Sequence, residues 1–211
     1  MNSQQPHNRL RILGVDPGSR LTGYGIVDNL GSQLSLVTHG TIKLASTSGP
    51  ATIALEDRLH QLHIQLTSLI HEYQPQVMVV ERVFFAKNAL SSLKLGQTRG
   101  AILLTAVLAN LKVAELSPTE VKLAITGHGR ADKHQLAKML EIIIGKGKQN
   151  FETADASDAL GLAICYARNL KLSILQDSSG ASAYFETRKK KPKAMSLADS
   201  IAHQIGATRK P

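Results

Sequence analysis

The chain has 211 residues, 43% of them hydrophobic, and a formal net charge of +9, which together fit one domain with a real core better than two domains. A single cysteine, Cys165, excludes an intrachain disulfide, and the longest nearly apolar run, Ala101–Leu111, is far short of the ~20 residues that a membrane helix needs. The N-terminal segment lacks the apolar stretch of a signal peptide, so a soluble, cytoplasmic protein is expected.

The first half of the chain predicts three strands and then a long helix. Short apolar or alternating runs predict strands at Leu10–Val15, Thr22–Val27 and Leu34–Leu44. The first of these strands ends at Asp16-Pro17-Gly18, a turn sequence in which Pro presets φ and Gly tolerates positive φ. Residues spaced by three and four then predict one buried face of an amphipathic helix that ends before Pro75. That face comprises Leu55, Leu59, Leu62, Leu66, Leu69 and Tyr73.

The second half alternates strands with helices. Strands are predicted at Val77–Val80 and Lys112–Leu116, and loops at Val83–Ala89 and Gly145–Asn150. Helices are predicted at Ser91–Leu111, from Ser117 to about Gly127, at Asp132–Ile144 and at Thr153–Leu170. The helix after Ser117 begins with Ser at the N-cap, Pro at the first helical position and Glu three residues after the cap. Early strands followed by alternation predict an α/β fold, a mixed sheet with helices on both faces.

The positive charge is uneven along the chain. Residues 1–177 carry 18 basic and 14 acidic side chains, whereas residues 178–211 carry 7 basic and 2 acidic ones. We therefore expect one domain over residues 1–177 and a basic, largely disordered tail over residues 178–211. A basic chain suits a nucleic-acid partner, although a solvated basic surface with a basic tail explains the charge equally well.

Four carboxylates stand at the edges of apolar segments. Asp16 ends the first strand, and Glu81 follows the strand predicted at Val77–Val80. Asp155 and Asp158 share one face at the start of an apolar helix. Each has a simpler explanation when taken alone: a turn, a surface ion pair, or acids that complement a helix dipole. Three separate segments that each present acid at an apolar edge favour a common site instead.

A cluster of four carboxylates requires a cation. Two carboxylates about 4 Å apart repel by roughly 4 kcal/mol at an effective dielectric near 20, unless a metal or raised pKa values relieve the repulsion. Oxygen ligands without Cys or His point to Mg²⁺ or Mn²⁺. Two such ions can clamp the attacking and leaving oxygens of a phosphodiester, so the pattern predicts metal-dependent phosphodiester chemistry.

The same acids lie in segments that resemble the RuvC-type Holliday junction resolvases, which are crossover junction endodeoxyribonucleases. The resemblance runs from about Ile12 to Arg168, and its four motifs occur in the family's order and spacing. They are Ile12–Gly25, Glu81–Asn88, Leu93–Gly100 and Ala154–Leu160. The resemblance implies a ribonuclease H-like fold and a homodimer that makes paired, symmetric nicks in a four-way junction during recombination and repair. It also implies catalysis by Asp16, Glu81, Asp155 and Asp158 with two Mg²⁺ ions per site.

The resemblance also implies residues that contact DNA. Lys122 and Lys133 correspond to basic residues near the scissile phosphate, and Phe84 to an aromatic residue that stacks on junction bases. Stacking of this kind contributes ~1–3 kcal/mol per base, although Phe84 could instead anchor its loop on the core. Six further cations are plausible phosphate contacts, each also explicable as solvated surface charge: Lys87, Lys94, Arg99, Arg130, Lys146 and Lys148. The branch-migration proteins RuvA and RuvB are further expected partners.

Two features depart from the family pattern, and other functions compete with it. Arg82 adds a cation beside Glu81 that could hold phosphate or point to solvent, and the role of the tail has no family counterpart. A noncatalytic junction-binding protein is one alternative. An actin-like phosphotransferase is another, because Asp16–Gly23 also resembles its phosphate loop, but the chain is short for two lobes. His60 and His63 share a helix face, which more often faces solvent than binds a metal.

Overall fold

The computed structural model describes residues 9–31, 33–45, 53–82, 88–145 and 153–178. The chain divides into two units, residues 1–172 and 173–211, and the sheet and the candidate site belong to the first. The expected tail lies outside the described residues except for Ser178, as do the loop predicted at 146–150 and most of the loop at 83–89.

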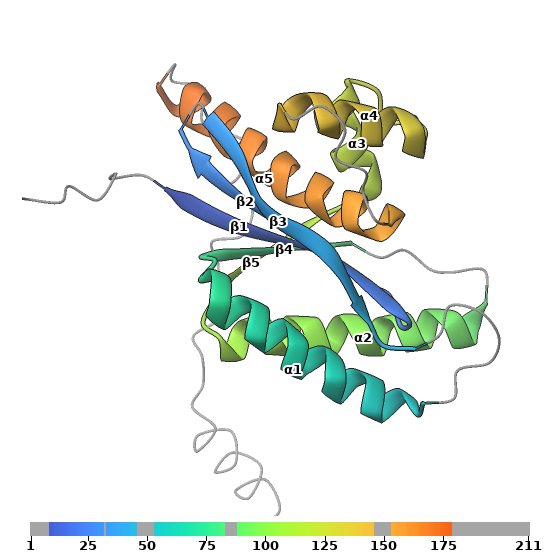
Figure 1. Cartoon of the computed structure of the whole chain (residues 1–211). Coiled ribbons are helices and arrows are strands. Elements are labelled where there is room, and N and C mark those ends of the chain that lie inside the picture. Colours follow the sequence, from blue (N-terminus) through green and yellow to red (C-terminus); the bar gives the residue numbers. More distant parts are fainter. Residues whose placement is uncertain (1–8, 32, 46–52, 83–87, 146–152, 179–211) are drawn as a thin grey trace, which may run out of the picture. The chain divides into compact units, whose positions relative to one another are not determined.

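One five-stranded mixed sheet forms the centre of the first unit (Figure 1). The strands are β1 Leu10–Asp16, β2 Leu21–Leu30, β3 Gln33–Lys43, β4 Val77–Glu81 and β5 Lys112–Leu116. Their order across the sheet is β3-β2-β1-β4-β5. The first three strands form antiparallel pairs, whereas β4 pairs parallel with both β1 and β5. The carboxyl ends of β1, β4 and β5 therefore lie at the same edge.

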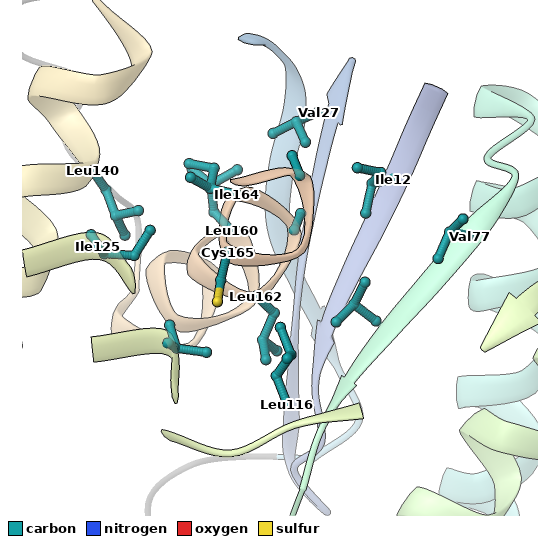
Figure 2. Packing of buried hydrophobic residues seen from close by; sticks show 14 of the residues in the cluster. Ile12, Val27, Val77, Leu116, Ile125, Leu140, Leu160, Leu162, Ile164 and Cys165 are labelled. Atoms are coloured by element: carbon teal, nitrogen blue, oxygen red, sulfur yellow. The ribbon is translucent and has the colours of Figure 1, made fainter. Parts of the chain in front are cut away.

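Helices cover both faces of this sheet (Figure 1). Two of them pack on one face, α1 Leu55–Tyr73 and α2 Ala89–Leu108, and three on the other, α3 Pro118–Thr126, α4 Lys133–Ile144 and α5 Ala154–Ser178. Strand alternation divides the core accordingly, since Leu13 points toward α1 and α2 while Ile12 points toward α5. Figure 2 shows the second core, where α5 places Leu160 and Ile164 between the sheet and α3 and α4.

Every predicted strand and helix is confirmed, with shifted ends. The predicted helix start at Ser117 is confirmed as a capping box, in which the Ser117 hydroxyl accepts from the Glu120 amide and Glu120 accepts from the Ser117 amide. Helix α2 begins at Ala89 rather than Ser91, because the Asn88 side chain caps it by accepting from the Leu90 amide at 2.9 Å. Helix α5 runs beyond the predicted end at Leu170.

The buried face of α1 differs from the predicted one. The buried residues are Arg58, Leu62, Leu66 and Ile70, whereas Leu55, Leu59, Leu69 and Tyr73 are only partly buried. The leucine spacing therefore predicted a buried face that is rotated slightly around the helix from the observed one. The observed face includes an arginine, which a search for hydrophobic residues does not find. Within the described residues, no helix is both long and apolar enough to cross a bilayer.

Glycines in β1 and β2 bring α5 very close to the sheet. A Cβ at Gly14 would overlap the Ala159 carbonyl of α5, and one at Gly25 would lie 2.6 Å from the Leu160 Cα. Gly14 and Gly25 pair with each other across the two strands, so they form one flat patch under the helix. The absence of side chains there lets the backbone of α5 rest directly on the sheet. This contact fixes where the first turn of α5 lies.

Candidate active site

Strand geometry directs Asp16 and Glu81 to the same face of the sheet. The parallel register aligns Val15 with Val80, so the two acids are the next residues on adjacent strands. Side chains alternate along a strand, and Val77 and Val79 of β4 point toward α5. Glu81 therefore faces α5, as does Asp16, which lies two residues beyond the Gly14 contact with that helix.

The first turn of α5 brings the other two acids to this edge. Asp155 and Asp158 lie three residues apart on the helix and face the same way. A Cβ at Gly23 would overlap the Asp155 carbonyl, and Gly23 is the ladder partner of Asp16. The small residue opposite Asp16 thus gives the acidic end of α5 room to approach the end of β1.

All four acids line one pocket of about 320 Å³. Lys122 from α3 and Lys133 from α4 line it as well, so six of the predicted site residues come together. The rest of the lining is apolar and was not predicted: Pro118, Val121, Leu136 and Leu162. Helical spacing could have revealed Leu162, which follows Asp158 by four residues and so shares its face.

Burial and mutual repulsion raise the pKa of two of the acids in the pocket. Burial raises the pKa of Asp16 to about 9, and the charge of Glu81, a hydrogen bond to Glu81, and the charges of Asp158 and Asp155 add to the rise. Burial also raises the pKa of Glu81; Asp158 adds to this rise, whereas the hydrogen bond with Asp16 and the charge of Lys133 oppose it. Without a bound cation, the carboxyl groups of Asp16 and Glu81 therefore resist ionising together.

Lys133 supplies part of the missing charge. Its Nζ lies 3.3 Å from the Asp158 Oδ2, and the charge of Asp158 raises the pKa of Lys133. The Lys133 side chain is 72% exposed, so the ion pair lies at the mouth of the pocket and is weak in water. Lys122 is half-buried and lines the same pocket. Both lysines can meet an anion that enters the pocket.

The other predicted DNA contacts have varied settings. Arg99 Nη2 lies 2.6 Å from the Glu115 Oε1 on the side of α2, outside the pocket lining. Lys94 is half-buried on α2, and Phe84 and Lys87 lie outside the described residues. Their contacts with DNA stay predictions.

Arg82 neither points only to solvent nor lines the pocket. Its Nη1 lies 3.9 Å from the Glu120 Oε2, and its Nη2 donates to the Glu115 carbonyl at 3.4 Å. Burial acts to raise the pKa of Glu120, but hydrogen bonds from Ser117 and the charge of Arg82 outweigh it and leave the pKa lowered. Arg82 thus links the end of β4 to the capped start of α3, which carries Lys122.

Comparison with known proteins identifies the family. Residues 12–166 match the family model described as "Crossover junction endodeoxyribonuclease RuvC". Proteins with that name from Shewanella piezotolerans and Rhizobium leguminosarum bv. trifolii are 44% and 43% identical to this chain. The matches cover 82% and 77% of this chain and 96% and 92% of the relatives, respectively.

Two solved structures extend the comparison. Thermus thermophilus RuvC in complex with a Holliday junction substrate is 28% identical, with a TM-score of 0.69 over 77% of this chain and 96% of that one. The yeast mitochondrial Holliday junction resolvase Ydc2 is 18% identical, with a TM-score of 0.61 over 81% and 83%, and so shows the fold alone. The expected ribonuclease H-like fold is confirmed, and the actin-like phosphotransferase loses its support. The chain belongs to the RuvC family of crossover junction endodeoxyribonucleases.

Proposed function

We propose that this RuvC-family endodeoxyribonuclease resolves Holliday junctions by paired, symmetric hydrolysis of phosphodiester bonds, in homologous recombination and DNA repair. The observation that carries the proposal is a single pocket lined by Asp16, Glu81, Asp155 and Asp158 together with two lysines. The solved complex of Thermus thermophilus RuvC with a Holliday junction substrate supports the choice of a branched substrate. The free Cys165 suits a reducing compartment, and we propose the cytoplasm.

The donors in the pocket suit Mg²⁺, with Mn²⁺ as a substitute. In the described part of the chain no three His, Cys, Asp or Glu side chains converge tightly enough to enclose an ion. Mg²⁺ does not need such a cage, because it keeps several waters and commonly uses one or two carboxylates plus substrate phosphate. Four acids that line one pocket suit a cation, since added positive charge would let them ionise together.

We propose two metal ions, held by Asp16, Glu81, Asp155 and Asp158. Such ions, when bound, supply Lewis-acid stabilisation to the attacking and leaving oxygens of a phosphodiester. The side chains of Lys122 and Lys133 would bind and orient the scissile phosphate. Lys133 would exchange its weak ion pair with Asp158 for this phosphate. The apolar wall formed by Val121 and Leu162 would limit the water around the reacting group.

Symmetric nicking requires two sites, and α2 offers a surface for a second copy of the chain. Five of its apolar side chains, more than half exposed, fall within one stripe at helical spacing: Leu90, Leu93, Leu104, Val107 and Leu108. Gly100 lies in this stripe, and a Cβ there would meet nothing within 4 Å. We propose that two copies pack α2 against α2 about a two-fold axis. Leu104→Glu should then shift the sedimentation coefficient to that of a monomer.

The deciding experiment compares a synthetic four-way junction with a linear duplex of the same arm sequence, each with and without Mg²⁺. We expect symmetric nicks in the junction alone and only with the metal. Junction binding should weaken steeply with salt, because several phosphates release counterions. Binding without any nicking in Mg²⁺ or Mn²⁺ would instead identify the noncatalytic junction-binding alternative. RuvA and RuvB remain proposed partners, to be tested by their effect on the nicking rate.

A further inference from the structure

Arg58 is a buried cation in the core-facing stripe of α1. Its side chain occupies the first buried position of the helix, followed at four-residue steps by Leu62, Leu66 and Ile70, and the residue is 4% exposed. Burial of a charged group is costly unless partners compensate it. Among the described residues no carboxylate forms an ion pair with Arg58. Hydrophobic packing of α1 therefore does not explain this arginine.

The hydrogen bonds of Arg58 lead to the turn that follows Asp16. Its Nη1 donates to the Ser19 carbonyl at 2.6 Å, and its Nε makes a longer bond of 3.4 Å to the Ala54 carbonyl. Ser19 lies in the turn that joins β1 to β2, three residues beyond Asp16. A charged donor strengthens a hydrogen bond to a carbonyl, and burial strengthens it further. The arginine thus anchors this turn to α1.

The same turn is held on its other sides by the sheet. The buried Thr22 hydroxyl donates to the Gly18 carbonyl at 2.9 Å. The Arg20 carbonyl accepts from the Leu44 and Ala45 amides at 2.8 and 3.2 Å, at the end of β3. Of these contacts, only the Arg58 bond comes from a helix outside the sheet. It ties the turn to α1, whereas the other bonds tie it to β2 and to the residues that follow β3.

We propose that Arg58 is a positioning residue for Asp16, an inference that rests on the proposed role of that carboxylate. Asp16 is the last residue of β1, and its ladder partner is Gly23, which has no side chain to pack against it. Strand geometry directs the carboxyl group of Asp16 into the pocket, and the turn that begins at the next residue holds the end of the strand that carries it. Arg58 holds that turn through Ser19 without itself lining the pocket.

The test uses Arg58→Met, which keeps the apolar stem and removes the donors, and Arg58→Lys, which keeps a charged donor. Arg58→Met should lower the single-turnover cleavage rate at saturating protein by about 10- to 100-fold, the usual effect of a small misplacement of a reacting group. Junction affinity should stay within about twofold, because direct DNA contacts are untouched. The Mg²⁺ concentration that half-maximally raises Tm should increase several-fold, and Arg58→Lys should recover part of both losses.

Leu62→Ala, one turn further along the same face of α1, is the matched control. It should lower Tm but leave the cleavage rate and the Mg²⁺ midpoint unchanged below its unfolding transition. Equal rate losses in Leu62→Ala and Arg58→Met, no recovery in Arg58→Lys, or a wild-type rate in Arg58→Met would each overturn the inference. Asp16→Asn separates it from the proposed function. Cleavage by that variant would remove the site itself, whereas an inactive Asp16→Asn beside a fully active Arg58→Met would remove only the role of Arg58.

Discussion

The two ends of β1 differ in how their charged side chains are paired. Near its start, Arg11 lies on the strand beside Asp28, with Nε–Oδ1 and Nη2–Oδ2 distances that are both 2.8 Å, and Nη1 donates to the Tyr73 carbonyl at 2.7 Å. At its end, the half-buried Asp16 meets another half-buried carboxyl group, Glu81, and the aspartates of α5. Charges are matched at the first end and left unmatched at the second.

The pKa values record this difference. The hydrogen bonds from Arg11 hold the pKa of Asp28 below its ordinary value, whereas burial and neighbouring acids raise that of Asp16 to about 9. A fold optimised only for stability would treat both ends alike. Under the proposed function, the unmatched end gives up stability in order to bind a cation and a substrate phosphate. The following predictions test this contrast, from the largest effect on cleavage to the smallest.

Asp16→Asn should affect chemistry far more than folding. We expect the rate of junction cleavage to fall by at least about a thousandfold, since a residue of a concerted catalytic unit is lost. Junction affinity should persist, and stability should not decrease, because the substitution removes a source of repulsion. Single-turnover cleavage with Mg²⁺, together with a binding titration, measures both effects. Full nicking by the variant would show that the unmatched end of β1 is not the active site.

Gly14→Val should damage both stability and activity. The new side chain would collide with the backbone of α5 at Ala159, so we expect a loss of about 3 kcal/mol in the free energy of unfolding and a displaced acidic turn. Urea denaturation and the cleavage assay measure the two consequences. Gly96→Ala in α2 is the control. Among the described residues outside its own helix backbone, no atom lies within 4 Å of the added Cβ, and the variant should gain up to about 1 kcal/mol of stability. Equal stability of Gly14→Val and the wild type would contradict the close helix contact.

Asp28→Asn should have the reverse profile of Asp16→Asn. It leaves the half-buried Arg11 without its carboxylate partner, so about 2 kcal/mol of stability should be lost while cleavage below Tm is unchanged. The lowered pKa of Asp28 means that its contribution is present above the ordinary value near 3.8 and disappears as pH falls through the folded-state value. Denaturation from neutral to acid pH measures this loss. If Asp28→Asn changed the cleavage rate at a temperature where the variant is fully folded, the two ends of β1 would not have separate roles.

The last prediction concerns stability alone, and is a pH slope of opposite sign at the Asp16 end. In metal-free protein, folded Asp16 keeps its proton up to about pH 9, whereas the unfolded chain releases it near 3.8. The folded state binds more protons across this window, so this group makes stability fall as pH rises through it. The stability of Asp16→Asn relative to the wild type should therefore grow with pH in EDTA, and Mg²⁺ should flatten the trend. Identical slopes in urea titrations of both proteins would contradict the raised pKa.

Sequence patterns predicted the elements and the four acids because both have local signatures. The capped start of α3 and the acids at strand ends need only neighbouring residues to be recognised. The role of Arg58 could not be predicted, since its partner at Ser19 is 39 residues away and a charged residue normally indicates an exposed position. The contact of Gly14 and Gly25 with α5 was missed for the same reason. A glycine in a strand indicates that another part of the backbone packs closely against it, but the sequence does not show which segment that is.

The proposed catalytic acids come from β1, β4 and the first turn of α5, which lie far apart in the chain. Synthesis proceeds from the N-terminus, so a nascent chain that has completed the whole sheet still lacks Asp155 and Asp158. Under the proposed chemistry, such a partial product could bind DNA through its cations but could not cut it. Under the same proposal, hydrolysis would begin only after α5 has docked on Gly14 and Gly25 of the sheet.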